Sequence, residues 1–264
     1  MKLVSGIFVV LLASSLCVVA EEKPKCHLSD FSKVDNALFR QKFDSRYCKK
    51  GKKAKCDQMW NNFLQLLDNI EADRRIKNVG TAAYLLATAY LETYSGNFSP
   101  TTKEQRGAVN DGQPYWKRDP ETGQSYFGRG WVQLTWKDKY EKAKKIIGLD
   151  FINDPDLALE TKNSYEILFR SMTEGWLEQY RSTAKGEGGT TSIRLGDFIS
   201  EESVNYDLAR TVINANCNGN CTTESRQKIG DKGYIPFPNF IDSAQKGAKE
   251  ARFFEEALCS SIAP

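Results

Sequence analysis

One stretch of the chain, VGTAAYLLATAYLETYSG at residues 79–96, is apolar on nearly every side when it is drawn as a helix. A helix that borders water carries a polar face, so a helix without one is expected in the interior of a domain. The stretch stops at Gly96, a residue common at helix ends, and Pro100 opposes an early restart. The stretch therefore predicts a buried helix around which the other elements must pack.

Helical spacing of apolar residues recurs elsewhere in the chain, whereas strand-like alternation is scarce. The segments with this spacing are 57–76, 137–147, 164–180 and 204–213. Between Phe98 and Tyr126 the chain is dense in Gly, Pro, Asp, Asn and Thr, which predicts a long loop. The pattern predicts one mainly helical (mainly α) domain whose loops border a groove.

Residues 1–20 have the layout of a cleavable secretory signal, with Lys2, a long apolar run and small residues up to Ala20. We therefore expect a secreted, extracellular protein. No later segment is apolar enough to span a bilayer, so no membrane association is expected. The predicted organisation is a signal peptide at 1–20, a basic, cysteine-bearing extension at 21–56 and the main domain at 57–264.

The cysteines favour disulfides over a metal site. Of the seven, Cys17 lies in the signal segment, and the other six would enter an oxidising compartment. They predict up to three disulfides, and the pairing stays open because six cysteines allow many connectivities. The sole histidine, His27, lies far in sequence from the Cys217/Cys221 pair, so we expect no metal and no other cofactor.

The stretch RYCKKGKKAKC at residues 46–56 carries six basic residues and no acid, although the net charge of the whole chain is only +3. Such a stretch is typical of a solvated loop, and it also fits a surface that docks onto an anionic partner such as a bacterial wall. Nucleic acid is not expected as a partner, because no interleaving of aromatic and basic residues and no known nucleic-acid-binding motif supports it.

Two glutamates are candidates for acid and base chemistry. Glu92 lies at the end of the apolar helix, where partial desolvation of its carboxyl suits a general acid. Glu104 follows in the loop beyond Pro100. Glycoside hydrolysis needs two carboxyl groups across a cleft, one to protonate the leaving oxygen and one to activate a water. Glutamate pairs are common, so this pair alone is a weak signal.

The stretch SYFGRGWVQLTW adds groups that such a cleft could use. Its two glycines permit close backbone approach, and the planar guanidinium of Arg129 can fix carboxylates or carbonyls. In an extended segment Gln133 and Thr135 would share one face and offer amide and hydroxyl groups to a sugar or a water. Trp131 and Trp136 could stack on sugar rings, although core packing is the more frequent fate of a tryptophan.

Three segments, AAYLLATAYLETYSGNF, DPETGQSYFGRGWVQLTWKDKYEKA and ARTVINAN, resemble the family 19 glycoside hydrolases, the chitinase group that includes phage endolysins. The second segment is more similar to the bacterial and phage branch than to the plant branch. The resemblance covers roughly residues 79–232 and implies a lysozyme-like, two-lobed helical catalytic domain with a central substrate cleft. It implies an endo-acting hydrolase of β-1,4-linked N-acetylglucosamine polymers; the partner is then a polysaccharide, and a monomer is the default.

The resemblance also implies a role for individual residues. Glu92 matches the acid of the family, Glu104 matches its second glutamate, and Thr135 matches the hydroxyl that helps to place the attacking water. The predicted substrate-binding residues are Gln133, Tyr140, Asn214, Arg129 and Trp136. The family inverts at the anomeric carbon, and that geometry separates the two carboxyl groups by about 6.5 to 9.5 Å to leave room for the water.

Three alternatives remain open. Glu121, in DPETGQ, is the second candidate for the base, because the loop that leads to Glu104 is longer than in the phage pattern. Peptidoglycan is the second candidate substrate, favoured by the phage-like sequence and the basic cysteine stretch. A binding protein without turnover is the third alternative, since Leu91 stands where the family usually has His and Asn97 lies in a glycosylation sequon, as does Asn220.

Overall fold

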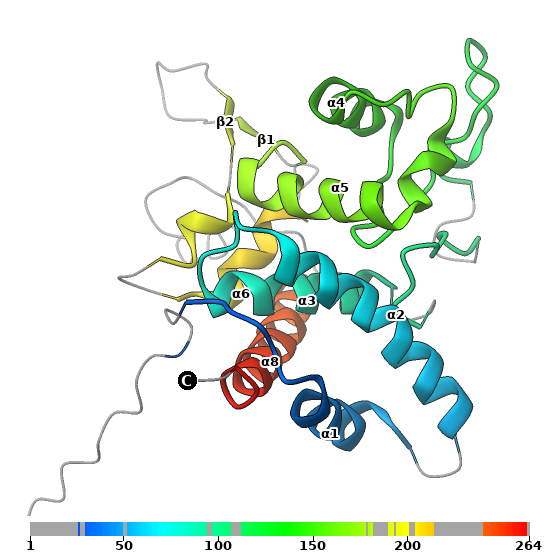
Figure 1. Cartoon of the computed structure of the whole chain (residues 1–264). Coiled ribbons are helices and arrows are strands. Elements are labelled where there is room, and N and C mark those ends of the chain that lie inside the picture. Colours follow the sequence, from blue (N-terminus) through cyan, green and yellow to red (C-terminus); the bar gives the residue numbers. More distant parts are fainter. Residues whose placement is uncertain are drawn as a thin grey trace, which may run out of the picture.

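Helix α3 (Val79–Thr93) is the buried centre of the structure, as its sequence predicts. Its buried residues run without interruption from Ala82 to Ala89. Helix α8 (Phe240–Cys259) lies alongside it (Figure 1). Ala248 and Ala251 of α8 are fully buried, and their small side chains let the two helices approach closely.

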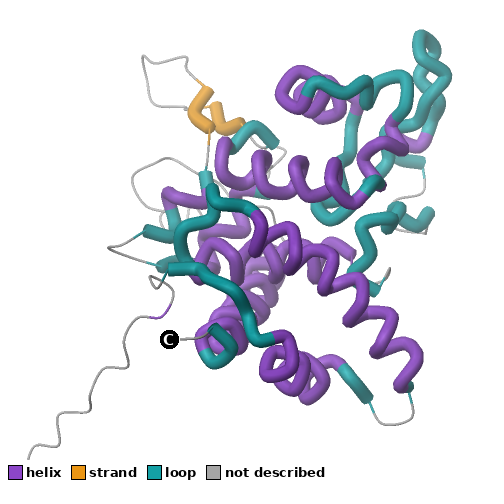
Figure 2. Tube along the Cα trace, viewed as in Figure 1, coloured by secondary structure: helices purple, strands orange, loops and turns teal. Residues whose placement is uncertain are grey.

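A computed structural model describes the chain and shows it to be mainly helical, which confirms the predicted fold class (Figure 2). The described residues are 26, 30–49, 52–93, 97–106, 112–177, 179–181, 190–192, 194–200, 204–213 and 240–262. The other α-helices are α1 (Asn36–Tyr47), α2 (Lys53–Ala72), α4 (Lys137–Ile147), α5 (Thr161–Glu174) and α6 (Tyr206–Ala209). Short 3-10 helices are η3 (Pro114–Trp116), η4 (Pro155–Leu159), η5 (Leu195–Asp197) and η6 (Arg210–Val212). Strands β1 (Gln179–Arg181) and β2 (Thr190–Ser192) pair antiparallel.

Helix α5 connects two groups of elements. It contacts α2 and α3 on one side and α4 on the other (Figure 1). The loop that carries the Gly-Arg-Gly sequence is attached to the first turn of α5, because Trp131 N donates to Ser164 Oγ at 2.8 Å. Within the described part of the chain, no helix combines the length and the apolar character that crossing a membrane requires.

The positions of the predicted helical segments agree with the structure better than their lengths do. The segment 137–147 coincides with α4. The segment 164–180 is too long at its C-terminal side, because α5 ends at Glu174 and Gly175 adopts the left-handed conformation with φ 69°. The segment 204–213 divides into α6 and η6. Helices α1 and α8 were not predicted.

Aromatic packing joins the N-terminal region to the rest of the core. Phe39 and Phe43 of α1 are fully buried, and each ring centroid lies 5.1 Å from that of Phe63 on α2. Phe254 of α8 stacks on Phe63 from another side at 5.9 Å. The predicted extension at 21–56 thus supplies core residues, and its predicted end at residue 56 falls inside α2.

Two disulfides resolve part of the cysteine pairing that the sequence left open. Cys26 pairs with Cys259, which ties the start of the described chain to the end of α8. Cys48 pairs with Cys56 and links the end of α1 to the first turn of α2. Cys217 and Cys221 lie outside the described residues.

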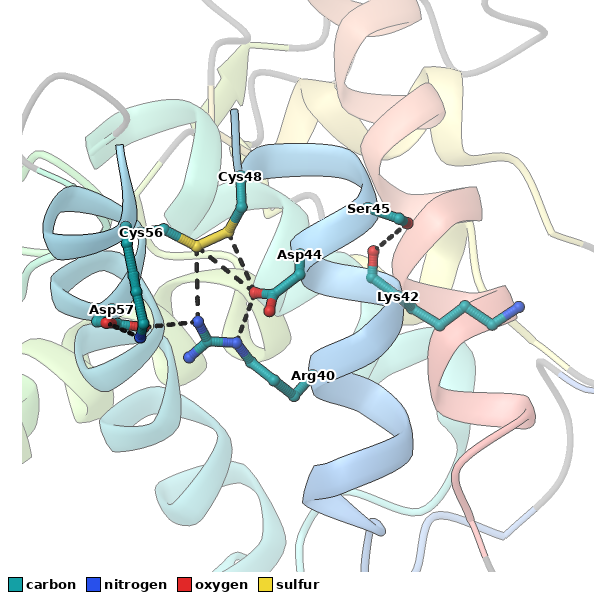
Figure 3. The surroundings of a disulfide bond; sticks show 8 residues. Arg40, Lys42, Asp44, Ser45, Cys48, Cys56 and Asp57 are labelled. Carbon is teal, nitrogen blue, oxygen red and sulfur yellow. Dashed lines mark hydrogen bonds and ion pairs between the residues drawn. A yellow bond between two sulfur atoms is a disulfide. The ribbon is translucent and has the colours of Figure 1, made fainter. Parts of the chain in front are cut away.

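The Cys48–Cys56 disulfide is surrounded by an ion-pair network (Figure 3). Arg40 donates to Asp44 at 2.5 Å and to Asp57 at 2.8 Å, so one guanidinium connects α1 and α2 beside the sulfurs. Asp44 Oδ1 lies 3.1 Å from Cys48 Sγ, which gives this group the spacing of metal ligands. Because both sulfurs are bonded to each other, the group offers no thiolate to a metal ion.

Candidate active site

The Gly-Arg-Gly loop is a tight turn, so the extended backbone in which Gln133 and Thr135 would share one strand face is not present here. Arg129 and Leu134 exchange backbone hydrogen bonds of 3.2 and 2.9 Å across it. Gly130 has φ 74° and Gln133 has φ 51°, both in the left-handed region. The turn reverses the chain because glycine adopts positive φ without steric cost. Gln133 and Thr135 share a surface through this turn, not through strand alternation.

Gly130 leads to the first prediction, because a side chain has no space there. A Cβ atom at this position would lie 2.6 Å from Ala158 O and 2.7 Å from Ser164 Oγ. We expect Gly130→Ala to lower the free energy of unfolding by about 2 to 4 kcal/mol, from strained φ and overpacking together. Chemical denaturation measures this loss. The matched control is Gly123→Ala: Gly123 also has positive φ, 69°, but its Cβ would meet nothing within 4 Å. Equal losses in both variants would contradict the steric argument.

Gly128 is the point at which the predicted catalytic loop residues meet. Its N–H donates to Glu104 Oε2 at 3.0 Å, and its carbonyl accepts from Glu104 N at 2.8 Å. A Cβ at Gly128 would lie 2.9 Å from Gln133 Oε1 and 3.2 Å from Thr135 Oγ1. The structure therefore brings Glu104, Gln133 and Thr135 together around one glycine, where only a bare backbone fits.

The Glu104 carboxyl group is half-buried and held on both oxygens. Tyr115, on η3, donates its hydroxyl to Oε1 at 2.9 Å, while Gly128 holds Oε2. Burial, together with the hydrogen bond and charge of Glu104, raises the pKa of Tyr115 to about 12. The phenol thus stays protonated near neutral pH and remains a hydrogen-bond donor to Glu104. Two fixed donors orient the carboxylate before any substrate arrives.

Thr135 and Gln133 each use their donors within the loop. Thr135 Oγ1 donates to Gln133 O at 2.7 Å, and Gln133 Nε2 donates to Thr102 O at 3.1 Å and to Gly130 O at 2.9 Å. These bonds fix the side chains and direct the oxygen of each toward the Gly128 side. The loop therefore presents acceptor oxygens next to Glu104.

Arg129 and Tyr140 lie below this surface, in the protein interior. Arg129 is 5% exposed; its Nε donates to Asp156 at 2.7 Å and its Nη1 donates to the Tyr140 hydroxyl at 3.0 Å. Tyr140 is fully buried and donates to Phe127 O at 2.9 Å. Both were predicted to bind substrate. In this structure they support the loop from behind, and direct contact with a sugar would require them to become exposed.

Asp156 compensates the charge of the buried Arg129. Burial alone would raise the pKa of the Asp156 carboxyl, but hydrogen bonds from Lys103 and Arg129 outweigh burial and hold the pKa below its ordinary value. Lys103 reaches Asp156 at 2.7 Å. Because Lys103 precedes Glu104 in the chain, this pair also fixes the backbone that carries the candidate base.

The two tryptophans of the loop have opposite environments. Trp131 is fully buried, and its indole N–H donates to Phe98 O at 3.0 Å. Trp136 is 43% exposed and meets the ring of Tyr115 edge to face, with centroids 4.8 Å apart. Trp136 is thus the tryptophan with a face available for stacking on a sugar.

Glu92 lies in the last turn of α3 with its side chain 17% exposed. Arg210, on η6, places Nη2 2.6 Å from Glu92 Oε1, and its own side chain is buried. The segment ARTVINAN contains Arg210, but its sequence pattern pointed to Asn214 and gave no signal for the ion pair with Glu92. Asn214 lies outside the described residues. The guanidinium therefore lies close enough to compensate the negative charge of the ionised Glu92 carboxyl.

Glu121 lies on the surface. Its side chain is 80% exposed and pairs with Lys137 at 2.8 Å.

The first glycosylation sequon does not lie in a fully exposed loop, since Asn97 is half-buried and Phe98 is fully buried. Asn220, of the second sequon, lies outside the described residues.

Residues 77–193 match the sequence model of the chitinase class I group, family 19 of the glycoside hydrolases. This segment belongs to glycoside hydrolase family 19. It contains Glu92, Glu104 and the Gly-Arg-Gly loop, and it ends before Asn214. The resemblance predicted from the sequence is confirmed.

Curated relatives include plant endochitinases. The chain is 33% identical over 75 residues to acidic endochitinase Q of Nicotiana tabacum, covering 26% of this chain and 30% of that protein. It is 29% identical over 116 residues to endochitinase At2g43610 of Arabidopsis thaliana, covering 42% and 40%. The chain thus spans well under half the length of these two relatives. Among solved structures, chitinase C of Streptomyces griseus is 20% identical, with 88% of this chain and 95% of that chain covered and a TM-score of 0.43.

Proposed function

We propose that the chain is a secreted, endo-acting chitinase that cleaves β-1,4-linked N-acetylglucosamine polymers with inversion at the anomeric carbon. The observation that supports it most is the meeting of Glu104, Gln133 and Thr135 around Gly128 inside the family 19 segment. Secretion rests on the apolar segment at residues 1–20, and we propose a monomer.

In the proposed reaction Glu92 acts in its protonated form: it donates its proton to the leaving glycosidic oxygen while a water attacks from the other face of the sugar, and the carboxylate that remains forms the ion pair with Arg210. Thr135 Oγ1 donates a hydrogen bond to Gln133 O. The Thr135 hydroxyl oxygen is therefore oriented to accept a hydrogen bond from that water. Glu104 takes the proton that the water loses. The C–O bond to the leaving sugar breaks as the bond to the water oxygen forms, and the product has the opposite anomeric configuration.

Release of reducing ends from colloidal chitin and from purified peptidoglycan tests the proposal. We expect release from chitin, and proton NMR of freshly cut chitin oligomers should show the α-anomer first, because inversion converts the β-linkage. Release from peptidoglycan alone would move the substrate to the bacterial wall. The absence of release from either polymer, with retention on one of them in a pull-down, would show a protein that binds without cutting. A β-anomer formed first would contradict the inverting mechanism.

A further inference from the structure

A pocket of about 180 Å³ lies where the end of α1, the start of α2 and helix α3 meet. Its lining residues are Arg46, Tyr47, Lys49, Lys52, Lys55, Cys56, Met59, Tyr90 and Asn97. Tyr90 lines the pocket, and Glu92 follows two positions later on the same helix. Residues two apart on a helix differ by about 200° around its axis, so the pocket lies on the face of α3 away from Glu92. The pocket is thus separate from the proposed catalytic group.

The wall of the pocket carries more positive charge than the neighbouring carboxylates compensate. Arg46 is neutralised by Glu250, at 2.7 Å. Lys49, Lys52 and Lys55 are exposed, and within the described residues none of the three forms an ion pair. Three lysines that form no ion pair among the described residues therefore line one small cavity, and the nearby carboxylates of Asp44, Asp57 and Glu250 are each bound by other side chains.

The start of α2 adds to this positive field. Lys52 is the N-cap of α2, it makes no side-chain capping bond, and the first turn contains no acidic residue. The amide groups at a helix N-terminus carry partial positive charge and favour anions. Lysines at such an end are electrostatically unfavourable in the absence of an anion, so the arrangement has a physical reason to bind one.

The disulfide fixes the junction of α1 and α2 beside the pocket before any ligand binds. Cys48 and Cys56 bracket the lysines along the chain, and their bond joins α1 to α2 (Figure 3). Arg40 holds the same junction through Asp44 and Asp57. Pre-organisation lowers the conformational entropy that a charged loop loses on binding, which favours a specific site over a diffuse basic surface.

We propose that this pocket binds the phosphate monoester group of a phosphorylated sugar. A phosphate monoester carries a charge of nearly −2 at neutral pH and three acceptor oxygens, which matches three ammonium donors better than the single charge of a carboxylate does. The rings of Tyr47 and Tyr90, with centroids 4.7 Å apart, also line the pocket and can contact the sugar ring. This binding is independent of the hydrolytic reaction.

Calorimetric titration of the full protein at low ionic strength tests the proposal, with glucose 6-phosphate, inorganic phosphate, glucuronate and glucose as ligands. We expect glucose 6-phosphate to bind most tightly, its affinity to fall with added salt, and glucose not to bind. Equal binding of glucuronate would overturn the assignment to phosphate. Equal binding of inorganic phosphate would overturn the contribution of the sugar. No binding of any anion would overturn the site itself.

A charge-matched pair of variants locates the binding. The triple change Lys49→Gln, Lys52→Gln and Lys55→Gln should weaken glucose 6-phosphate binding at least about tenfold and leave chitin hydrolysis within about twofold. The control changes three exposed lysines elsewhere, Lys145→Gln, Lys162→Gln and Lys246→Gln, and should bind as the parent does. Equal weakening in both would reveal a net-charge effect and overturn the site. Because hydrolysis is measured separately, failure of this proposal and failure of the proposed function are distinguishable.

Discussion

Replacing Glu104 by Gln should reduce the kcat for chitin oligomers by about 10² to 10⁴-fold, the usual contribution of a general base. Gln keeps the shape of the side chain, but its amide cannot take a proton from the attacking water. The NH₂ group of the glutamine would also face a hydrogen-bond donor, either Gly128 N or the Tyr115 hydroxyl, and it cannot accept a hydrogen bond from either. Steady-state hydrolysis of a defined oligomer measures the loss, and KM should change much less than kcat.

The matched control is Glu121→Gln, which tests the other candidate base. Glu121 is exposed and paired with Lys137 on the surface, so we expect its kcat to stay within about twofold of the parent value. Thermal unfolding of both variants checks that the fold is kept. A large loss with Glu121→Gln and none with Glu104→Gln would place the base at Glu121 and leave the contacts around Gly128 with a structural role only.

The parts of the fold that the sequence predicted well are those with strong local patterns. Helix α3 was evident because apolar residues occupy nearly every side, and α4 because its apolar residues recur at helical spacing. These signals depend only on neighbours within the same segment. They do not require knowledge of what packs against the helix.

Helices α1 and α8 were missed because their buried sides are narrow or made of small residues. In α1 the buried residues are Phe39 and Phe43, with polar or charged residues around them. In α8 much of the buried side is alanine, such as Ala248 and Ala251, and alanine contrasts weakly with its surroundings. Phe254 and Leu258 are larger side chains of this helix that are fully buried, and two residues one turn apart do not define a period.

The candidate site shows the same difference between contacts within one segment and contacts between distant segments. Gly128, Gln133 and Thr135 lie close together in the chain, so their joint role could be proposed from one short motif. The pairing of Arg210 with Glu92 joins segments more than a hundred residues apart, and no local pattern announces it. The burial of Arg129 was also hidden, because it depends on Asp156 in another segment.

The second large effect is expected at Glu92. Glu92→Gln should lower the kcat for chitin oligomers by about 10² to 10⁴-fold, because the amide cannot protonate the leaving oxygen. The buried guanidinium of Arg210 would also lose the negative charge 2.6 Å away, so we expect stability to fall by about 1 to 3 kcal/mol. Denaturation curves should therefore accompany the kinetics, to separate lost chemistry from lost folded protein.

A change of leaving group distinguishes the acid from the base in these variants. A chitin oligomer linked to a nitrophenolate leaving group needs little protonation, so Glu92→Gln should cleave it far faster than it cleaves an unmodified oligomer. Glu104→Gln should gain no such advantage, because activation of the water is needed whatever group departs. Rescue confined to Glu92→Gln would identify Glu92 as the acid. Equal rescue of both variants, or of neither, would contradict the division of roles, and the ion pair with Arg210 would then hold α3 and η6 together without taking part in proton transfer.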